Sequence, residues 1–268
     1  MGSLSRRRFA LALGAASLRA ETQQEKGKRV VLEALAALGG EKFTGMRNRV
    51  ESGRAYAFYR QRLTGLAFAR FYTKNLEPSR AAPLIPAQVQ RQALGKKESE
   101  IIVYNEKGEG YILTYRGAKP MPAERNRRYR ESTIRNALYI ISSRLGEQGL
   151  EFMSKGQDVI DNNPVELVDI YDSMNRSTVV AFHRSTRLPL QQTYSYQDPV
   201  TKDRAEEIIY FSKYRDVGGG VQWPFHTERT RNGEKAFEIF AESVEINQEL
   251  ANTLFEIPTG MNILPADE

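Results

Sequence analysis

Hydrophobic and polar positions follow two different periods along this chain, first that of a helix and later that of strands. Over 26–38 the apolar residues have helical spacing, and the glycine pair at 39–40 predicts the end of that helix. Over 55–60 and 66–71, successive side chains alternate in character. This period of two predicts two strands, and we place the turn between them near Thr64-Gly65.

The next stretch combines an irregular segment with a hairpin. Residues 78–94 contain three prolines and several alanines without a clear period, which indicates a proline-rich loop. Ile101–Tyr104 and Tyr111–Tyr115 then flank the turn sequence at 105–110, which contains two glycines. Two apolar runs around such a turn predict a β-hairpin.

A second helix is predicted to begin at Pro122, because proline is favoured at the start of a helix. The apolar positions that follow fall three and four residues apart and form one stripe. The stripe consists of Ile134, Ala137, Leu138, Ile141 and Leu145. The second half of this helix should therefore pack on an apolar surface.

After Gly149 short strand patterns alternate with turn signals. They span 165–171, 178–183, 191–196, 207–214, 224–230 and 236–246. Regular spacing of this kind predicts an antiparallel meander. In the last strand the apolar positions change from odd to even numbers near Glu242-Ser243, which predicts a β-bulge there. The fold class expected from these patterns is α+β and mostly β.

The N-terminal segment has the pattern of an export signal. Ser5-Arg-Arg-Arg-Phe9 precedes the apolar run 10–18, and cleavage is expected after Ala20. Arg6, Arg7 and Phe9 match a twin-arginine signal, whereas Ala10 and Leu11 depart from it, so general secretion stays open. A basic tail leading into a short core helix is the alternative, but three arginines at a helix N-terminus would oppose the helix dipole. We expect residues 1–20 to be the signal and 21–268 to form one domain.

Composition excludes several classes of function. The formal charge of +6 falls by four when Arg6, Arg7, Arg8 and Arg19 are removed with the signal, so the remaining chain has no basic excess suited to nucleic acid. The chain has no cysteine, which excludes disulfides, thiolate metal sites and a lipid-attachment cysteine. We therefore expect a soluble, unanchored periplasmic monomer that does not bind nucleic acid.

Residue patterns for catalysis or metal binding are few. His183 and His226 lack paired metal-ligand spacing, so a histidine metal site would need acids from distant positions. Asp169 and Asp172 could form a carboxylate pair for glycoside hydrolysis, but their position at a strand end favours turn residues. The basic run 125–130 could meet anionic headgroups, or it could be the solvated half of a helix. We expect no catalytic residue, no metal and no cofactor.

Several short motifs resemble the outer-membrane lipoprotein-sorting family, the LolA/LolB-like periplasmic proteins. They are Ala36-Ala-Leu-Gly-Gly40, Trp223-Pro-Phe225, Val244-Glu-Ile-Asn247 and Leu254-Phe-Glu-Ile-Pro258. The order of elements over about residues 28–258 is similar as well. The resemblance implies a strongly curved antiparallel half-barrel whose helices cover its concave face, with a hydrophobic cavity for acyl chains.

On this basis we expect a carrier or binding protein for a lipid or the acyl chains of a lipoprotein, and not an enzyme. Transient contact with a membrane-bound donor or acceptor would accompany such a role. The residues expected to line the cavity are Tyr56, Phe58, Phe68, Tyr111, Leu113, Ile134, Leu138 and Ile141. The stripe of the second helix is expected to act as a lid, with only part of the stripe fully buried. The alternatives are an envelope sensor of lipoproteins with the same fold and an exported hydrolase.

Overall fold

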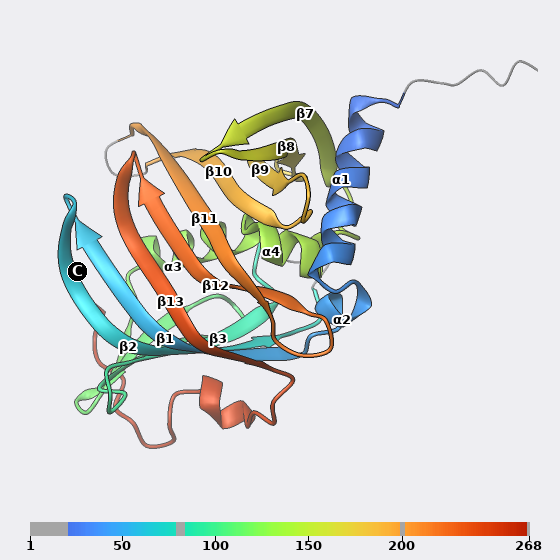
Figure 1. The fold of residues 1–268 in the computed structure, drawn as a ribbon. Helices are drawn as coiled ribbons and strands as arrows, with labels where there is room; N and C mark the ends of the chain where they lie inside the picture. The colour runs from blue at the N-terminus through green and yellow to red at the C-terminus, as the bar shows by residue number, and fades with distance from the viewer. Residues whose placement is uncertain (1–20, 79–83, 199–201, 267–268) are drawn as a thin grey trace, which may run out of the picture.

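The computed structural model describes residues 21–78, 84–198 and 202–266, and in these ranges thirteen antiparallel strands form one curved, open sheet (Figure 1). The expected half-barrel with helices on its concave side is confirmed. The predicted export signal, residues 1–20, lies outside the described residues. The strands are β1 Asn48–Tyr59, β2 Arg62–Asn75, β3 Gln88–Leu94, β4 Glu100–Tyr104, β5 Gly110–Thr114, β6 Gly117–Pro120, β7 Glu151–Ile160, β8 Asn163–Tyr171, β9 Ser177–His183, β10 Pro189–Gln197, β11 Arg204–Asp216, β12 Gln222–Arg231 and β13 Glu234–Ile246.

The sheet is made of two meanders joined at one place. Strands β1 to β6 and strands β7 to β13 each follow one another in sequence order, and β1 pairs with β13 between them. Five of the strand pairings show a shift of register. Such bulges increase local twist and bend the strands, which accounts for the curvature.

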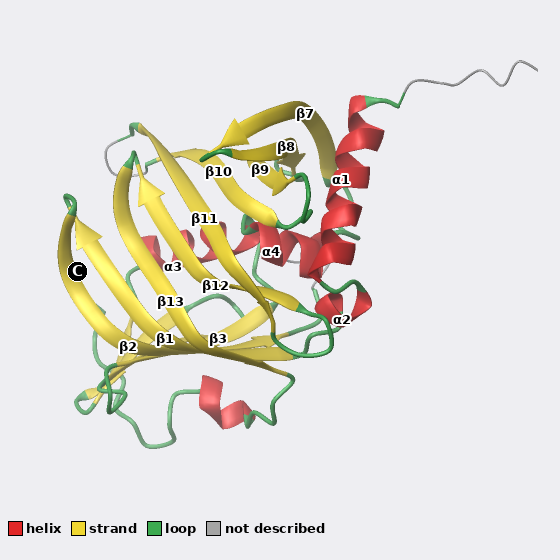
Figure 2. Ribbon diagram, viewed as in Figure 1, coloured by secondary structure: helices red, strands yellow, loops and turns green. Residues whose placement is uncertain are grey.

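The helices lie along the concave side and at one end of it (Figure 2). They are α1 Gln23–Leu38, α2 Glu41–Thr44, α3 Ala123–Ile134 and α4 Ala137–Tyr139, which continues into the π-helical turn η1 Ile140–Arg144. A 3-10 turn, η2 Asn252–Phe255, precedes the C-terminal segment. Thr22 and Glu25 form a capping box at the start of α1, and Gly39 ends that helix with a φ of 122°.

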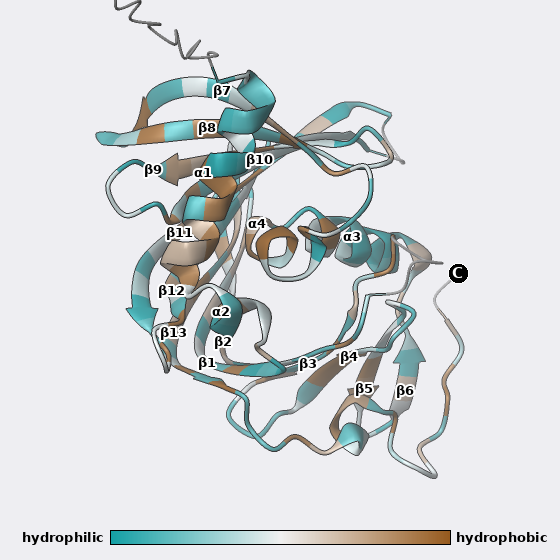
Figure 3. Ribbon diagram, turned by 90° about the vertical axis from the view of Figure 1, so that its right-hand side faces the viewer, coloured by the Kyte–Doolittle hydropathy of each residue, from teal (hydrophilic) through white to brown (hydrophobic). Residues whose placement is uncertain are grey.

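The main core lies between the helices and the strands of the second meander. It joins α1, α2, α4 and η1 to inner side chains of β7, β8, β9, β11, β12 and β13, and Trp223 packs there at 6.3 Å from the Phe43 ring. Two smaller clusters lie on opposite faces of β4 and β5, because adjacent residues of a strand point in opposite directions. One contacts α3 on the concave face, and the other packs beneath the C-terminal segment (Figure 3).

Most of the predicted strands and the bulge are confirmed. The six strand patterns after Gly149 correspond to β8 to β13, and the predicted hairpin at 101–115 is β4 and β5. Between β1 and β13, Ser52 pairs with Ser243 and Gly53 with Ala241, so Glu242 is the extra residue of the predicted bulge. Strand β7 was not predicted, because most of its side chains are polar and it lies at the sheet edge.

The predicted turn near Thr64-Gly65 is wrong. The chain reverses at Arg60-Gln61, where φ is 48° and 63°, and Gly65 lies inside β2 opposite Ala57. Positive φ at both central residues is the geometry of tight hairpin turns, which usually select asparagine or glycine. Arg60 and Gln61 therefore gave no turn signal in the sequence.

The proline-rich loop is shorter than predicted. Its residues 79–83 lie outside the described part of the chain, but its end, Gln88–Leu94, is strand β3 between β2 and β4. Polar side chains such as Gln90 and Gln92 occupy positions where most strands carry apolar ones. Strand pairing on both sides, and not hydrophobic alternation, defines this element.

The second helix begins as predicted but is interrupted. α3 ends at Ile134, and α4 starts after Asn136, whose side chain accepts the N–H groups of Leu138 and Tyr139. Gln192 of β10, fully buried, accepts the Ala137 N–H at 2.6 Å and donates to the Arg135 carbonyl. The break is therefore satisfied by a side chain from a distant strand.

Candidate functional site

The register of the sheet places Tyr56, Phe58 and Phe68 on its convex face. Arg49 stacks over the Trp223 ring at 3.8 Å, so the odd positions of β1 face the concave side. Tyr56 pairs with Leu66 and Glu238 among the even positions, and Phe68 pairs with Arg54. The Phe58 ring lies beneath Lys235 on the same convex side.

Tyr111 and Leu113 also face away from the concave side. They pack with Val103 in the cluster beneath the C-terminal segment, where Ile257 and Met261 cover them. The other three predicted cavity residues, Ile134, Leu138 and Ile141, are buried on the concave side with the helices. The structure therefore does not bring the eight predicted residues together, because the sheet lies between the two groups.

The apolar stripe of the second helix belongs to the core instead of forming a lid. Leu138 and Ile141 are part of the main core cluster, and Leu145 packs at its edge, only partly buried. The expectation that only part of the stripe is fully buried agrees with this arrangement. A lid would have to leave the sheet to admit a ligand, which these core contacts oppose.

A partly exposed apolar strip occupies the concave face of β13, β1 and β2. Cross-strand pairs place Ala55 beside Ile239 and Ala67, and the face continues through Phe237 and Phe71. We call these five residues the concave apolar strip. Phe71, Phe237 and Ile239 remain partly exposed although they face the inside of the curve. The side chains between them, Ala55 and Ala67, are short.

α3 crosses the concavity above this sheet (Figure 3). One side of the helix is attached through Tyr129, whose ring stacks on Tyr104 at 3.6 Å, and through Asn126, which accepts the Gly110 N–H at 2.8 Å. Its other side shares a small hollow with Tyr194 and Tyr196. α3 thus covers the concave side, and the helix itself makes few apolar contacts.

The basic run 125–130 lies on α3. Arg127 and Arg128 both pair with Glu124, at 2.8 Å and 3.5 Å, and all three side chains are partly exposed. Exposed pairs of this kind stabilise a helix only slightly. The run is the polar part of the helix, as one of the two interpretations predicted, and it remains accessible beside the concave side.

A cluster of three hydrogen-bonded polar side chains on β10 and β11 faces α3. The Glu207 carboxylate accepts hydrogen bonds from the Tyr194 hydroxyl at 2.8 Å and the Tyr196 hydroxyl at 3.2 Å. Burial, with the negative charge of Glu207, raises the pKa of Tyr196 to about 12 and that of Tyr194 further. Both tyrosines are therefore neutral hydrogen-bond donors at physiological pH.

Arg49 and Glu51 of β1 form a largely buried ion pair on the concave face, next to the main core. The Arg49 Nε is 3.7 Å from a Glu51 oxygen. Burial lowers the pKa of Arg49 and raises that of Glu51, while each charge partly opposes the shift of the other. Arg49 stacks on Trp223 of the main core and Glu51 pairs with Phe71, so the ion pair lies between the main core and the concave apolar strip.

Two larger hollows lie at the other end of the helices. One of about 650 Å³ is lined by Ile85, Ala87, Tyr139, Ser143 and Arg144 among others, and an open one of about 870 Å³ adjoins it beside Ser173. Both combine polar with apolar side chains. Arg144 in the first is already held by Glu147 and the Ile134 carbonyl.

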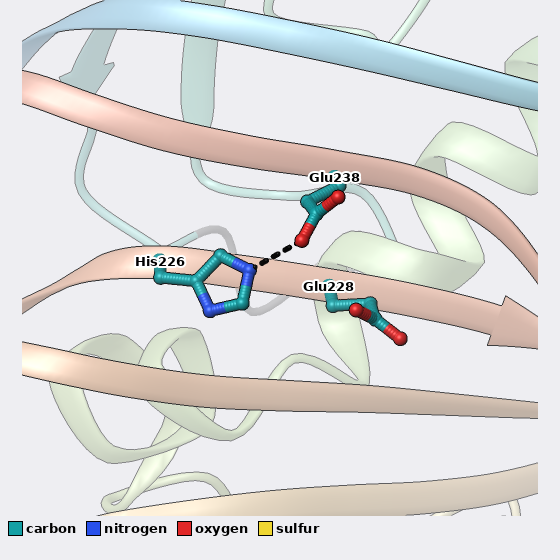
Figure 4. A group of neighbouring side chains, drawn as sticks. All are labelled: His226, Glu228 and Glu238. Atoms are coloured by element: carbon teal, nitrogen blue, oxygen red, sulfur yellow. Dashed lines mark hydrogen bonds and ion pairs between the residues drawn. The ribbon is translucent and has the colours of Figure 1, made fainter. Parts of the chain in front are cut away.

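His226 lies close to two acids, Glu228 on its own strand β12 and Glu238 on the neighbouring strand β13. His226, Glu228 and Glu238 offer ligand atoms within 4.8 Å of one another on the convex face (Figure 4). His226 Nε2 lies 2.7 Å from Glu238, and the Lys235 ammonium contacts Glu228 at 2.6 Å and Glu238 at 3.3 Å. Because the lysine already neutralises both carboxylates, the group is organised as an ion-pair network. The other histidine, His183, accepts two N–H groups of the turn after β9.

Asp172 is a turn residue, as predicted, whereas Asp169 lies inside β8 and is paired with Met153 and Val179, so the prediction is wrong for Asp169. Asp172 accepts the N–H groups of Met174 and Arg176 in the turn after β8, and the Arg176 guanidinium binds its carboxylate. Burial acts to raise the pKa of Asp172, but these hydrogen bonds outweigh it and the pKa is lowered. Asp169 accepts the Tyr171 hydroxyl at 2.8 Å.

In the described part of the chain, no helix is both long enough and apolar enough to cross a bilayer. No protein-family model matches the sequence. No curated protein matches it either.

Solved structures do resemble the fold. A domain named as an outer membrane lipoprotein-sorting protein from Vibrio parahaemolyticus aligns with a TM-score of 0.58 at 11% identity, over 87% of this chain and 97% of that one. A DUF1329 family protein from Desulfovibrio piger gives 0.57 at 10% identity, over 86% and 97%. A LolA superfamily protein from Nitrosomonas europaea gives 0.49 at 10% identity, over 83% and 97%. The first two likenesses show that this chain has a fold of the lipoprotein-sorting type.

Proposed function

We propose that this protein binds a lipid, or the acyl chain of a lipidated protein, on the concave apolar strip beneath α3. The proposal rests on this strip, because Phe71, Phe237 and Ile239 stay partly exposed on the concave side of the sheet. A similar structure named for lipoprotein sorting supports the same class of ligand. Catalysis forms no part of the proposal.

The free energies of burial and of association determine how much of such a ligand must be buried. Each buried CH₂ group contributes about 0.8 kcal/mol, whereas association costs on the order of 4 to 15 kcal/mol. A bound chain must therefore bury most of its length between α3 and the sheet. The partly exposed arginines of α3, Arg127 and Arg128, would then contact the polar end of the ligand.

Neighbouring residues on opposite faces of β13 provide the test. Ile239→Glu places a charge in the concave apolar strip and should weaken binding of a fluorescent fatty acid at least tenfold, by about 1.4 kcal/mol or more. Phe240→Glu introduces the same charge on the convex face, where Phe240 stacks on His226, and should change the affinity less than about twofold. Circular dichroism would confirm that both variants fold.

Equal losses in the two variants would contradict this location of the ligand. Native mass spectrometry of the protein purified from cells tests the ligand class directly, because a retained lipid adds a defined mass. Protein that carries no lipid mass and does not bind the fluorescent fatty acid would contradict the proposed function.

We also propose that residues 1–20 direct export to the periplasm. The N-cap of α1, Thr22, follows the expected cleavage position after Ala20 almost at once. Changing Arg6 and Arg7 together to lysine should retain the protein in the cytoplasm, since lysine lacks the planar guanidinium of the twin-arginine signal. Cell fractionation and immunoblotting would measure this. Undiminished periplasmic protein in the variant would contradict the twin-arginine route, and cytoplasmic wild-type protein would contradict export.

A further inference from the structure

The β1–β2 hairpin differs in composition from the rest of the chain. Residues 52–76 contain no aspartate or glutamate, but they include four arginines, one lysine and six aromatic residues. The whole chain, by contrast, has nearly balanced charge with 39 basic and 33 acidic residues. This hairpin is therefore a basic, aromatic extension of the sheet.

Large apolar side chains are exposed at the tip of the hairpin. Tyr59, Leu63 and Leu66 expose 64%, 55% and 60% of their surfaces, on either side of the turn at Arg60-Gln61. In Figure 1 this tip projects on the side of the molecule opposite α1. Exposed apolar residues that occur singly need no explanation, but a cluster of them marks an interaction site.

The exposed leucines continue a larger apolar face. Leu63 pairs with Phe58 and Leu66 with Tyr56, so they lie on the convex side with Phe68. We call these five residues the hairpin apolar face. It contains the three aromatic residues that the sequence had assigned to a lipid cavity. The structure thus presents them outward instead of toward the helices.

Basic side chains lie at the tip of the hairpin and on both of its faces, because Arg54 pairs with Phe68 on the convex face and Arg62 pairs with Tyr59 on the opposite face. Arg60 and Arg62 are exposed at the tip, and the Arg60 guanidinium lies 5.3 Å from the centre of the Tyr59 ring. Arg54 pairs at 3.3 Å with Glu242 of β13, but both side chains are more than half exposed, which makes the pair weak in water. The guanidiniums near the tip are therefore available to an anionic surface.

We propose that the tip of the β1–β2 hairpin docks on the surface of an anionic lipid bilayer. Leu63 and Leu66 would enter the boundary of the acyl chains, and Tyr59 would lie among the headgroups, where amphipathic rings are favoured. Arg54, Arg60 and Arg62 would contact the lipid phosphates. Aliphatic, aromatic and basic side chains together, without an acid within the hairpin, match the two components of interfacial membrane binding.

Docking in this way would bring the concave apolar strip close to the membrane. Ala55 and Ala67 of that strip belong to the same two strands as the hairpin apolar face, on their other side. Membrane docking by this hairpin does not require lipid binding by the concave side. A protein could contact the bilayer through this hairpin whether or not it removes a lipid from it.

The absence of cysteine allows a test at single positions of the full-length protein. Leu63→Cys and the control Leu32→Cys, which is 48% exposed on α1, would each be labelled with an environment-sensitive fluorophore. Vesicles of mixed phosphatidylglycerol and phosphatidylcholine should shift the emission at position 63 to shorter wavelength and increase it severalfold. The label at position 32 should remain unchanged.

The charge contribution is tested separately. Arg60→Gln combined with Arg62→Gln should weaken vesicle binding, followed by the label at position 63, about 30-fold, because each basic residue contributes about a factor of five. The outcomes that overturn the proposal are no response at position 63, an equal response at position 32, or a response at position 63 to a protein partner but not to vesicles. An undiminished affinity of the double arginine variant for these vesicles would also overturn it.

Discussion

Gly53→Ala should destabilise the protein by about 3 kcal/mol, because the added methyl group has no space between β1 and β13. A Cβ atom at this position would lie 2.1 Å from the Phe240 carbonyl oxygen and 2.8 Å from the Ala241 Cα. Both are backbone atoms that can move only if the strands separate. Since β1 and β13 join the two meanders, their separation weakens the whole sheet.

Urea unfolding followed by circular dichroism would measure this loss. Gly65→Ala is the matched control, since Gly65 lies on β2 of the same hairpin and its Cβ would meet only the Ala57 side chain, at 3.4 Å. Removing a glycine from a strand without a clash should change the stability by less than about 1 kcal/mol. Similar unfolding midpoints for the two variants would show that the β1–β13 contact tolerates a side chain.

Leu138→Ala should cost about 3 kcal/mol of unfolding free energy, within the usual range of about 2 to 5 kcal/mol for a buried leucine. Leu138 is 4% exposed in the main core, so truncation leaves a cavity that its neighbours cannot fill completely. Leu145→Ala removes the same atoms at the partly buried edge of this core and should cost less.

The affinity of the Leu138→Ala variant for the fluorescent fatty acid distinguishes a core position of Leu138 from a position in a lid. Because Leu138 packs in the core, its truncation should leave that affinity unchanged in the folded variant. A marked loss of affinity in folded protein would support the lid predicted from the sequence, whereas a loss of stability close to zero with unchanged affinity would exclude Leu138 from both core and lid.

The periodicity of the sequence identified elements but not the direction in which they face. Alternation showed that Tyr56 and Phe58 share a side, and the structure agrees. Which side meets the helices depends on partners far away in the chain, such as the stacking of Arg49 on Trp223. For this reason the predicted cavity combined residues that the sheet separates.

Irregular backbone features such as bulges and turns could be predicted only where they changed the hydrophobic pattern of the sequence. The bulge at Glu242 shifts the apolar positions of β13 from odd to even, and this shift is visible in the sequence. The turn at Arg60-Gln61 and strand β3 change no such pattern, because their backbone geometry is imposed by pairing with neighbouring strands. Strand pairing of this kind leaves no signal in the local sequence.

The sequence by itself determined the first helix, most strands of the second meander and the order of elements, because hydrophobic period, capping residues and turn residues act over a few positions. The tertiary structure alone decided the join of β1 to β13, the break of the second helix against Gln192 and the outward face of the β1–β2 hairpin. Each of these depends on which distant groups complete a strand pair, satisfy a buried backbone group or cover an apolar face. Such contacts form only when the chain has folded.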